Sequence, residues 1–256
     1  MSRLELVAFD VDGTLVCGPD GLTVWEVLNR RYLGTSDVNR ERYALYLRGE
    51  LSYEEWVALD IEGWRAAGAT RAEMVREIAP LRLVDGARET IAELRGRGCR
   101  LAVISGTLDL LLDTLWPDHS FDEVRTNRIE FDPSGRIAGW QATRYDMEGK
   151  ARALREMAER AGLPLARCAF VGDSSNDVWV AREAGFSVAF NPRSPELESV
   201  ASAVVHSDDL RAILPHLAGD ATDDRGPARS GTRPDPRDRR SPEPSARGAS
   251  RRSRRA

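Results

Sequence analysis

The feature of this sequence that most constrains its fold is a regular alternation of short apolar runs and helix-period segments over residues 81–218. Runs such as "CRLAVIS", "CAFVG" and "SVAF" have the length and branching of buried strands, and stretches with apolar residues every three or four positions separate them. Such alternation is typical of a mostly parallel sheet with right-handed crossovers. We therefore predict an α/β fold, a Rossmann-like mostly parallel sheet with helices on both faces, whose first strand is "RLELVAF" (3–9).

Two patterns complete this predicted core, residues 1–16 and 81–218. The segments "EVRTNRIEF" and "RIAGWQA" are joined by "DPSG", which predicts a hairpin or paired strands. Near the end, "AVVH" predicts a short strand, and the apolar spacing that follows predicts a helix over residues 208–217.

A helical block interrupts the alternation directly after the first strand. Residues 17–80 contain four stretches with apolar spacing of three and four and no strand between them. Ser52 and Glu55 have the spacing of a capping box at the start of one of these helices. We predict that residues 17–80 form an all-helical cap inserted into the core.

Residues 219–256 differ from the rest of the chain in composition. They contain eleven Arg and six acids, are rich in Pro, Gly and Ser, and have almost no large apolar side chain. A segment of this kind buries too little surface to offset the entropy of ordering, so we predict a disordered tail. Its "RRSRR" run could contact nucleic acid or another polyanion. We favour an unselective, solvated extension and expect no nucleic-acid partner.

The patterns of apolar residues, cysteines and histidines argue against a membrane protein, a disulfide-bonded protein and a zinc protein. No apolar run approaches the ~18 residues of a membrane span, and the N-terminus lacks signal-peptide organisation, so we expect a soluble cytoplasmic protein without a membrane partner. Cys17, Cys99 and Cys168 form no closely spaced pair, which indicates free thiols. Three scattered His argue against a zinc site.

Polar side chains follow three of the predicted strands. Asp10 and Asp12 follow "LVAF", Ser105 and Gly106 follow "LAVI", and Asp173 follows "CAFVG". In an open parallel sheet the site lies at the carboxyl ends of the strands, near the point where the strand order reverses. We therefore expect these residues to converge.

Lys150 is the only lysine among the 37 basic residues of the chain, and it lies at the start of a predicted helix. One interpretation is chance, because Lys is a good helix former. The other is that this position needs a compact ammonium on a flexible stem, which a planar guanidinium cannot replace. The acids at the strand ends favour the second interpretation, because they supply partners for the charge.

The two carboxylates of Asp10 and Asp12 predict a cation site. Residues two apart on extended backbone project the same way, and close carboxylates repel unless a cation lies between them. Mg²⁺ prefers such oxygen ligands together with phosphate, and Asp173 would add a third carboxylate. Gly13 allows a tight turn whose N–H groups face an anion.

The same residues suit phosphoryl transfer, which needs an in-line nucleophile, positive charge and a proton for the leaving group. Asp10 can form an aspartyl phosphate, while Asp12 can protonate the leaving oxygen and then activate water. Ser105 and the Gly106 N–H can hold phosphate oxygens, and Lys150 can neutralise charge shared by Asp10 and the phosphate. Each motif alone also fits a surface turn or an Asp-rich loop, but their order after three separate strands favours the catalytic interpretation.

The motifs "DVDGTL", "ISGT", "GK" at 149–150 and "VGDSSND" resemble the four signature motifs of the haloacid dehalogenase-like hydrolases. The resemblance covers residues 1–218 and is most similar to the phosphoserine phosphatase branch with a helical cap. It implies Asp10 as nucleophile, Asp12 as acid and base, and metal ligation by Asp10, Asp173 and the Asp12 carbonyl. It further implies catalytic roles for Ser105 and Lys150, substrate binding by Gly106, Thr107 and Asn176, and support of the site by Asp177.

We therefore predict a Mg²⁺-dependent phosphomonoester hydrolase acting on a small phosphorylated metabolite through an aspartyl phosphate. A phosphotransferase or mutase would use the same intermediate and stays open at this point. A phospho-signalling receiver also uses acids, a hydroxyl and a Lys, but it has no helical insertion after its first strand. A polyanion-binding protein that acts through the basic tail is the alternative from a different class.

The predicted substrate departs from that of the branch. The resemblance implies an acid after the first motif, where this chain has Pro19 followed by Asp20, and a cap arginine that pairs with the substrate carboxylate. Aligning "GELSYEEWVALD" places Asp60 at the arginine position, although Arg65 or Arg48 could reach the site instead. Aromatic residues of the cap, namely Trp25, Trp56 and Trp64, serve either helix packing or cation–π contact. We predict that phosphoserine is a poor substrate and that an ester without a carboxylate, such as a cationic one, is preferred.

Overall fold

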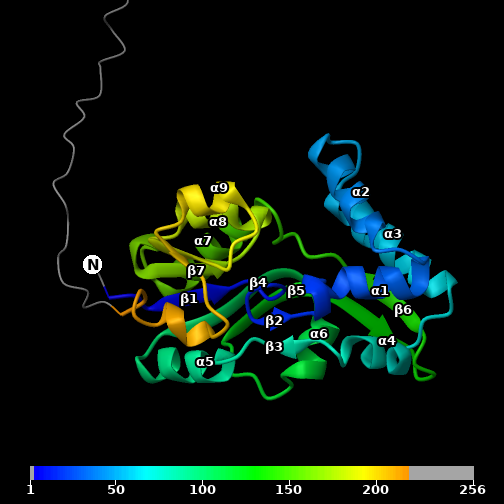
Figure 1. Ribbon diagram of the computed structural model, residues 1–256, viewed down its shortest axis with the longest axis horizontal. Helices are drawn as coiled ribbons and strands as arrows, with labels where there is room; N and C mark the ends of the chain where they lie inside the picture. The colour runs from blue at the N-terminus through cyan, green and yellow to red at the C-terminus, as the bar shows by residue number, and fades with distance from the viewer. Residues whose placement is uncertain (1–2, 219–256) are drawn as a thin grey trace, which may run out of the picture. The chain divides into compact units, whose positions relative to one another are not determined.

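The computed structural model describes residues 3–218, and its main element is a seven-stranded sheet in the order β6-β5-β4-β1-β7-β8-β9 (Figure 1). Neighbouring strands pair in parallel except β5 and β6, which form the predicted antiparallel hairpin. The mostly parallel α/β prediction is therefore confirmed. The strands are β1 (Leu6–Phe9), β4 (Arg100–Leu108), β5 (Glu123–Phe131), β6 (Ile137–Gln141), β7 (Cys168–Gly172), β8 (Phe186–Phe190) and β9 (Ala203–Val205).

Both faces of the sheet are covered by helices, because the central strands are apolar on both sides. In β1, Leu6 and Ala8 belong to the same buried cluster as Leu154 of α7, whereas Val7 and Phe9 pack in the opposite cluster, which contains residues of α5. This alternation is the period of two of a strand that is buried on both faces. The covering helices are α5 (Ala87–Gly96), α6 (Asp109–Leu115), α7 (Gly149–Ala161), α8 (Val178–Glu183) and α9 (Pro195–Val200).

The segment predicted as a cap contains the expected four helices, α1 (Val24–Leu33), α2 (Asp37–Leu47), α3 (Tyr53–Ala66) and α4 (Arg71–Ile78). The capping box of Ser52 and Glu55 is present at the start of α3. Buried side chains of α1 and α3, such as Leu28 and Trp64, belong to the same cluster as Val103 of β4, so these helices pack against the core. The division into a core and a separate cap domain stays a prediction.

A two-stranded antiparallel ribbon pairs the segment that enters the four helices with the segment that leaves them. β2 (Val16–Cys17) precedes the helices and β3 (Arg82–Leu83) follows them, and the two strands pair antiparallel. Strands of two residues are too short to leave a periodic pattern, which is why the sequence did not predict them.

The helix predicted over residues 208–217 is wrong in kind and length. The structure has a 3-10 helix at Leu210–Ile213 followed by turns. Pro215 explains the difference, because proline has no N–H and its ring clashes with the carbonyl four residues earlier in an α-helix.

Three further predictions concern the cysteines, membrane spans and the C-terminal tail. Cys17, Cys99 and Cys168 are free thiols, as predicted. Within residues 3–218, no helix combines the length and the apolar character needed to cross a membrane. The predicted disordered tail, residues 219–256, lies outside the described residues.

Candidate active site

The candidate site lies where the strand order of the sheet reverses. β1 has β4 on one side and β7 on the other, and the carboxyl ends of parallel strands at such a point form a crevice. The structure places a cavity of about 860 Å³ there. Among the residues lining it are six predicted from the sequence: Asp10, Asp12, Ser105, Gly106, Thr107 and Asn176.

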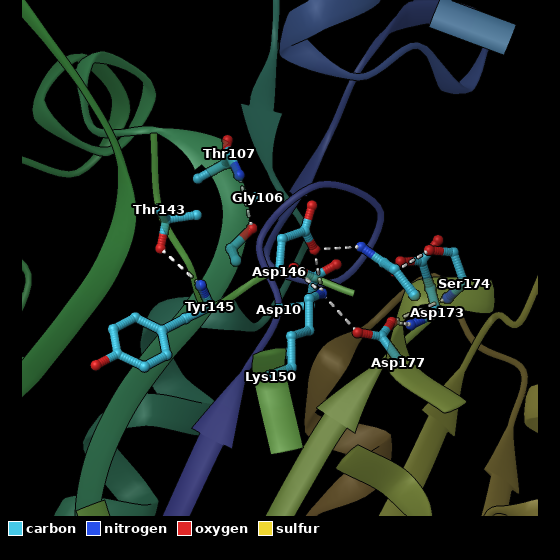
Figure 2. A network of polar contacts seen from close by, with 12 residues as sticks. Asp10, Gly106, Thr107, Thr143, Tyr145, Asp146, Lys150, Asp173, Ser174 and Asp177 are labelled. Carbon is cyan, nitrogen blue, oxygen red and sulfur yellow. Dashed lines mark hydrogen bonds and ion pairs between the residues drawn. The ribbon is translucent and has the colours of Figure 1, made fainter. Parts of the chain in front are cut away.

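Lys150 is completely buried at this site and lies between carboxylates (Figure 2). Its Nζ lies 2.9 Å from Asp10 Oδ1 and 2.7 Å from Asp177 Oδ1. Burial alone would lower the pKa of Lys150, but the charges of Asp10 and Asp177 outweigh burial and raise the pKa. The only lysine of the chain is therefore a charged group enclosed at the floor of the site.

Three buried acids form what we call the acidic cluster: Asp10, Asp173 and Asp177, each with an oxygen within 4.8 Å of the others. Burial raises the pKa of Asp173 to about 8, against the opposing charge of Arg193. The Oδ1 atom of Asp173 is buried and has no hydrogen-bond partner among the described residues. Three carboxylates this close, one of them with an unpartnered buried oxygen, suit a hard divalent cation.

The carboxylate of Asp177 belongs to the cluster and that of Asp12 does not, so Asp10 and Asp12 do not form the close carboxylate pair expected from their spacing. The ligand that the resemblance implies at Asp12 is its carbonyl, which stays a prediction. Asp177 is held by the chain itself. Its Oδ2 accepts hydrogen bonds from the backbone N–H groups of Asp173 and Ser174, at 2.9 and 3.0 Å, and its Oδ1 contacts Lys150. Asp177 thus fixes the loop after β7 and the position of Lys150 together.

Asp12 connects the loop after β1 to the first helix of the predicted cap. Its Oδ1 accepts a hydrogen bond of 2.9 Å from the N–H of Val24, the first residue of α1. Burial raises the pKa of Asp12 to about 6, despite this hydrogen bond, which favours the charged form. A carboxyl with this pKa exchanges a proton readily near neutral pH, as a general acid and base must.

Gly13 gives the first motif its shape. Its φ is +86°, and a Cβ at this position would lie 2.2 Å from Asp173 Oδ2. Any side chain would therefore be strained by the backbone and would also displace the acidic cluster.

The second motif offers hydroxyl and amide groups to the cavity. The Thr107 N–H donates to Ser105 Oγ at 3.1 Å, and Thr107 Oγ1 is buried without a hydrogen-bond partner among the described residues. The carbonyl of Gly106 accepts hydrogen bonds from Trp25 Nε1 at 2.8 Å and Asn127 Nδ2 at 2.6 Å. A side chain of α1 and one of β5 thus hold the backbone of this motif.

Two charged residues of the site were not predicted. Asp146 accepts a hydrogen bond from Asn176 Nδ2 at 3.0 Å and lies 3.9 Å from Lys150 Nζ. Its position four residues before the lysine was an available signal. Arg193 pairs with Asp173 Oδ2 at 2.8 Å and donates to the Gly21 carbonyl at 3.2 Å. In a chain this rich in arginine, no sequence signal marks it.

Asp60 lies at the cavity, as the sequence predicted, but it has an arginine partner. Its side chain lines the cavity, but it is buried and forms an ion pair with Arg42 of α2, which the sequence did not indicate. Burial nevertheless raises the pKa of Asp60 to about 6. Arg42 therefore pairs with Oδ1 of this carboxylate, whereas Oδ2 is buried without a hydrogen-bond partner among the described residues.

The other cap residues named in the sequence analysis differ in whether they line the cavity. Arg65 lies over the ring of Trp140, and Arg48 pairs with Glu50, so the structure brings neither into the cavity. Trp64 is buried and donates to Asn29 Oδ1 at 2.8 Å, which is a packing role. Trp25 and Trp56 line the cavity, whereas Pro19 and Asp20 do not.

The sequence of this chain matches the model of a known protein family. The model of the haloacid dehalogenase-like hydrolase family matches residues 7–182. The chain therefore belongs to the haloacid dehalogenase-like hydrolases.

Within this family the chain is similar to phosphoserine phosphatases. It is 34% identical over 213 residues to the phosphoserine phosphatase SerB2 of Mycobacterium tuberculosis. The aligned region covers 82% of this chain and 49% of the relative. The chain is 28% identical over 223 residues to the phosphoserine phosphatase of Methanocaldococcus jannaschii, covering 84% of this chain and 98% of the relative. The chain spans about half the length of the mycobacterial relative and of the Streptomyces coelicolor phosphoserine phosphatase.

The solved structures agree with the fold. A phospho-aspartyl intermediate analogue of phosphoserine phosphatase superposes with a TM-score of 0.68 at 24% sequence identity, over 84% of this chain and 99% of that chain. At this level of identity the likeness shows the architecture of the sheet and its helices.

Proposed function

We propose that this protein hydrolyses phosphomonoesters of small metabolites through an aspartyl phosphate on Asp10. The observation that carries the proposal is the position of the Asp10 carboxylate. It lies at the cavity floor, 2.9 Å from a buried ammonium and beside two further buried carboxylates. A nucleophile held by a cation in an enclosed site suits attack on a phosphoryl group, whose negative charge needs compensation.

The reaction has two steps that balance on residues of this chain. In the first, a carboxylate oxygen of Asp10 attacks phosphorus, the bond from phosphorus to the ester oxygen breaks, and Asp12 donates a proton to that oxygen. In the second, Asp12 takes a proton from water, the hydroxide attacks phosphorus, and the bond to Asp10 breaks to release phosphate. Lys150 stays protonated throughout, because its partners keep its pKa high.

The acidic cluster is proposed as the site of Mg²⁺. The Oδ1 atom of Asp173, which has no hydrogen-bond partner within residues 3–218, fits this ion, as does the hard-oxygen chemistry of the donors. Asp10, Asp173 and the Asp12 carbonyl would hold the ion, with Asp177 supporting the loop. When bound, Mg²⁺ would neutralise charge on the phosphate oxygens.

The test is covalent trapping. Native protein given a ³²P-labelled phosphomonoester and quenched in acid should retain label on the chain, whereas Asp10→Asn should retain none and lose turnover. Asp113→Asn, on an acid outside the cavity lining, is the matched control. Retention of most of the activity in Asp10→Asn would contradict the assignment of the nucleophile.

A further inference from the structure

We propose that the cavity selects phosphomonoesters whose leaving group carries an amine or quaternary ammonium and no carboxylate, an inference that rests on the proposed hydrolase function. The part of the cavity formed by the cap helices is rich in aromatic side chains and acids. Its aromatic members are Trp25, Tyr43, Tyr53 and Trp56.

The aromatic side chains form a connected wall around Trp56. The ring centroids of Tyr43 and Tyr53 lie 6.3 and 6.2 Å from that of Trp56, and Tyr46, outside the cavity lining, lies 6.4 Å from it. Electron-rich ring faces attract cations, and Trp does so most strongly. A cavity wall of this composition favours an organic ammonium over an anion.

Two contacts fix this wall over the phosphate-binding end of the site. The hydroxyl of Tyr43 forms a hydrogen bond of 2.9 Å with Ser175 Oγ in the last motif. The hydroxyl of Tyr53 accepts one of 2.8 Å from Asn127 Nδ2, which also donates to the carbonyls of Gly106 and Thr107. The rings are therefore anchored to the same loops that hold the reacting group.

The cations of the described cavity lining already have carboxylate partners. Arg193 pairs with Asp173 at 2.8 Å, and Arg40, at the exposed rim, pairs with Asp37 at 3.1 Å. Arg42, which lies behind the lining, pairs with Asp60. A substrate carboxylate would have to displace one of these partners before it found a cation.

The acids of the same wall make the local charge negative. Asp37 and Asp60 each have an arginine partner, but the Glu26 carboxylate accepts hydrogen bonds from the N–H and hydroxyl of Thr23 and forms no ion pair among the described residues. The Glu26 charge helps to raise the pKa of Arg193 but has no direct ion-pair partner among the described residues, so it also attracts a cationic group and repels an anionic one.

Four esters separate the charge of the leaving group from its size: phosphoserine, phosphoethanolamine, phosphocholine and the neutral 3,3-dimethylbutyl phosphate, which has the shape of phosphocholine. We expect kcat/KM for phosphocholine to exceed that for the neutral isostere by roughly 3- to 30-fold, the range of a cation–π contact. We expect phosphoethanolamine to exceed phosphoserine by about 10-fold or more, because only the carboxylate differs.

Variants of the wall identify the residue responsible. Trp56→Leu should bring the ratio of phosphocholine to isostere close to one, whereas Trp56→Phe should restore part of it. Trp179→Leu is the matched control, because Trp179 is a half-exposed tryptophan of α8 outside the cavity lining. This variant should keep the native ratio.

The outcomes separate this inference from the function on which it rests. A preference for phosphoserine, or equal rates for phosphocholine and its isostere, overturns the selectivity and leaves the hydrolase standing. An unchanged ratio in Trp56→Leu overturns the role of the aromatic wall. Failure to hydrolyse any of the four esters overturns the proposed function and the selectivity together.

Discussion

Replacing the only lysine with arginine separates geometry from charge at the centre of the site. Lys150→Arg keeps the positive charge, so a purely electrostatic role would survive it. The side chain of Lys150 has no exposed surface, and its Nζ contacts Asp10 and Asp177 at 2.9 and 2.7 Å. The longer, planar guanidinium has no free space there and must push one of these carboxylates away.

The expected loss follows from these distances. A displacement of Asp10 by ~1 Å is enough to lower the rate about 100-fold, and the overpacked side chain should lower the free energy of unfolding by ~1–3 kcal/mol. Lys150→Ala leaves the two carboxylates buried without their cation, so we expect it to cost ~3–5 kcal/mol of unfolding free energy. Both variants should lose at least ~100-fold in kcat/KM.

The assay is phosphate release together with thermal unfolding of each variant. Arg152→Lys is the matched control, since it makes the reverse exchange two residues along the same helix, where the side chain is half-exposed. It should leave turnover and unfolding unchanged. Turnover of Lys150→Arg within about threefold of native would refute the geometric reasoning and return Lys150 to the status of a helix residue.

Three further perturbations test separate parts of the site. Gly13→Ala should abolish turnover, because its Cβ would lie 2.2 Å from Asp173 Oδ2. Gly135→Ala is the control: Gly135 also has a positive φ, but a Cβ there would have no atom within 4 Å, so this variant should lose stability alone. Comparable turnover in the two variants would contradict the steric argument. Mg²⁺ should raise the unfolding temperature of the native chain and EDTA should reverse this, with a smaller shift in Asp173→Asn; an equal shift would place the ion elsewhere. Asp60→Asn should free Arg42 and raise kcat/KM for phosphoserine relative to phosphoethanolamine by ~10-fold, and an unchanged ratio would show that Arg42 does not reach the substrate.

The convergence of the motifs could be predicted because it depends on topology. Asp10, the Ser105–Thr107 segment and Asp173 each lie at the carboxyl end of a strand, and the strand–helix alternation indicates that these ends meet. Lys150 could be placed among them because it is the only lysine in an arginine-rich chain and belongs to a recognisable motif, "GK" at 149–150. No side-chain packing had to be known for this step.

The charge partners could not be predicted, because they depend on how helices pack. Arg42 and Asp60 lie on different helices, and Arg193 reaches Asp173 from a segment twenty residues further along the chain. Neither pair has a spacing that one helix or one strand would impose. Only the relative placement of the elements makes them neighbours, and one-dimensional periodicity contains no information about that placement.

The proposed reaction and the proposed substrate selectivity depend on these two different sets of residues. The reacting groups are held by strand ends and by a network in which Asp177 fixes both its own loop and Lys150, so a change there should affect every substrate alike. Under the proposed function the leaving group would meet α2 and α3, whose Tyr43 and Tyr53 hydroxyls form hydrogen bonds with Ser175 and Asn127 beside the reacting groups. Substitutions on these helices can therefore reverse the preference for charge without disturbing the phosphoryl-transfer groups. On this proposal one set of motifs would serve esters of opposite leaving-group charge, so the motifs alone do not identify the substrate.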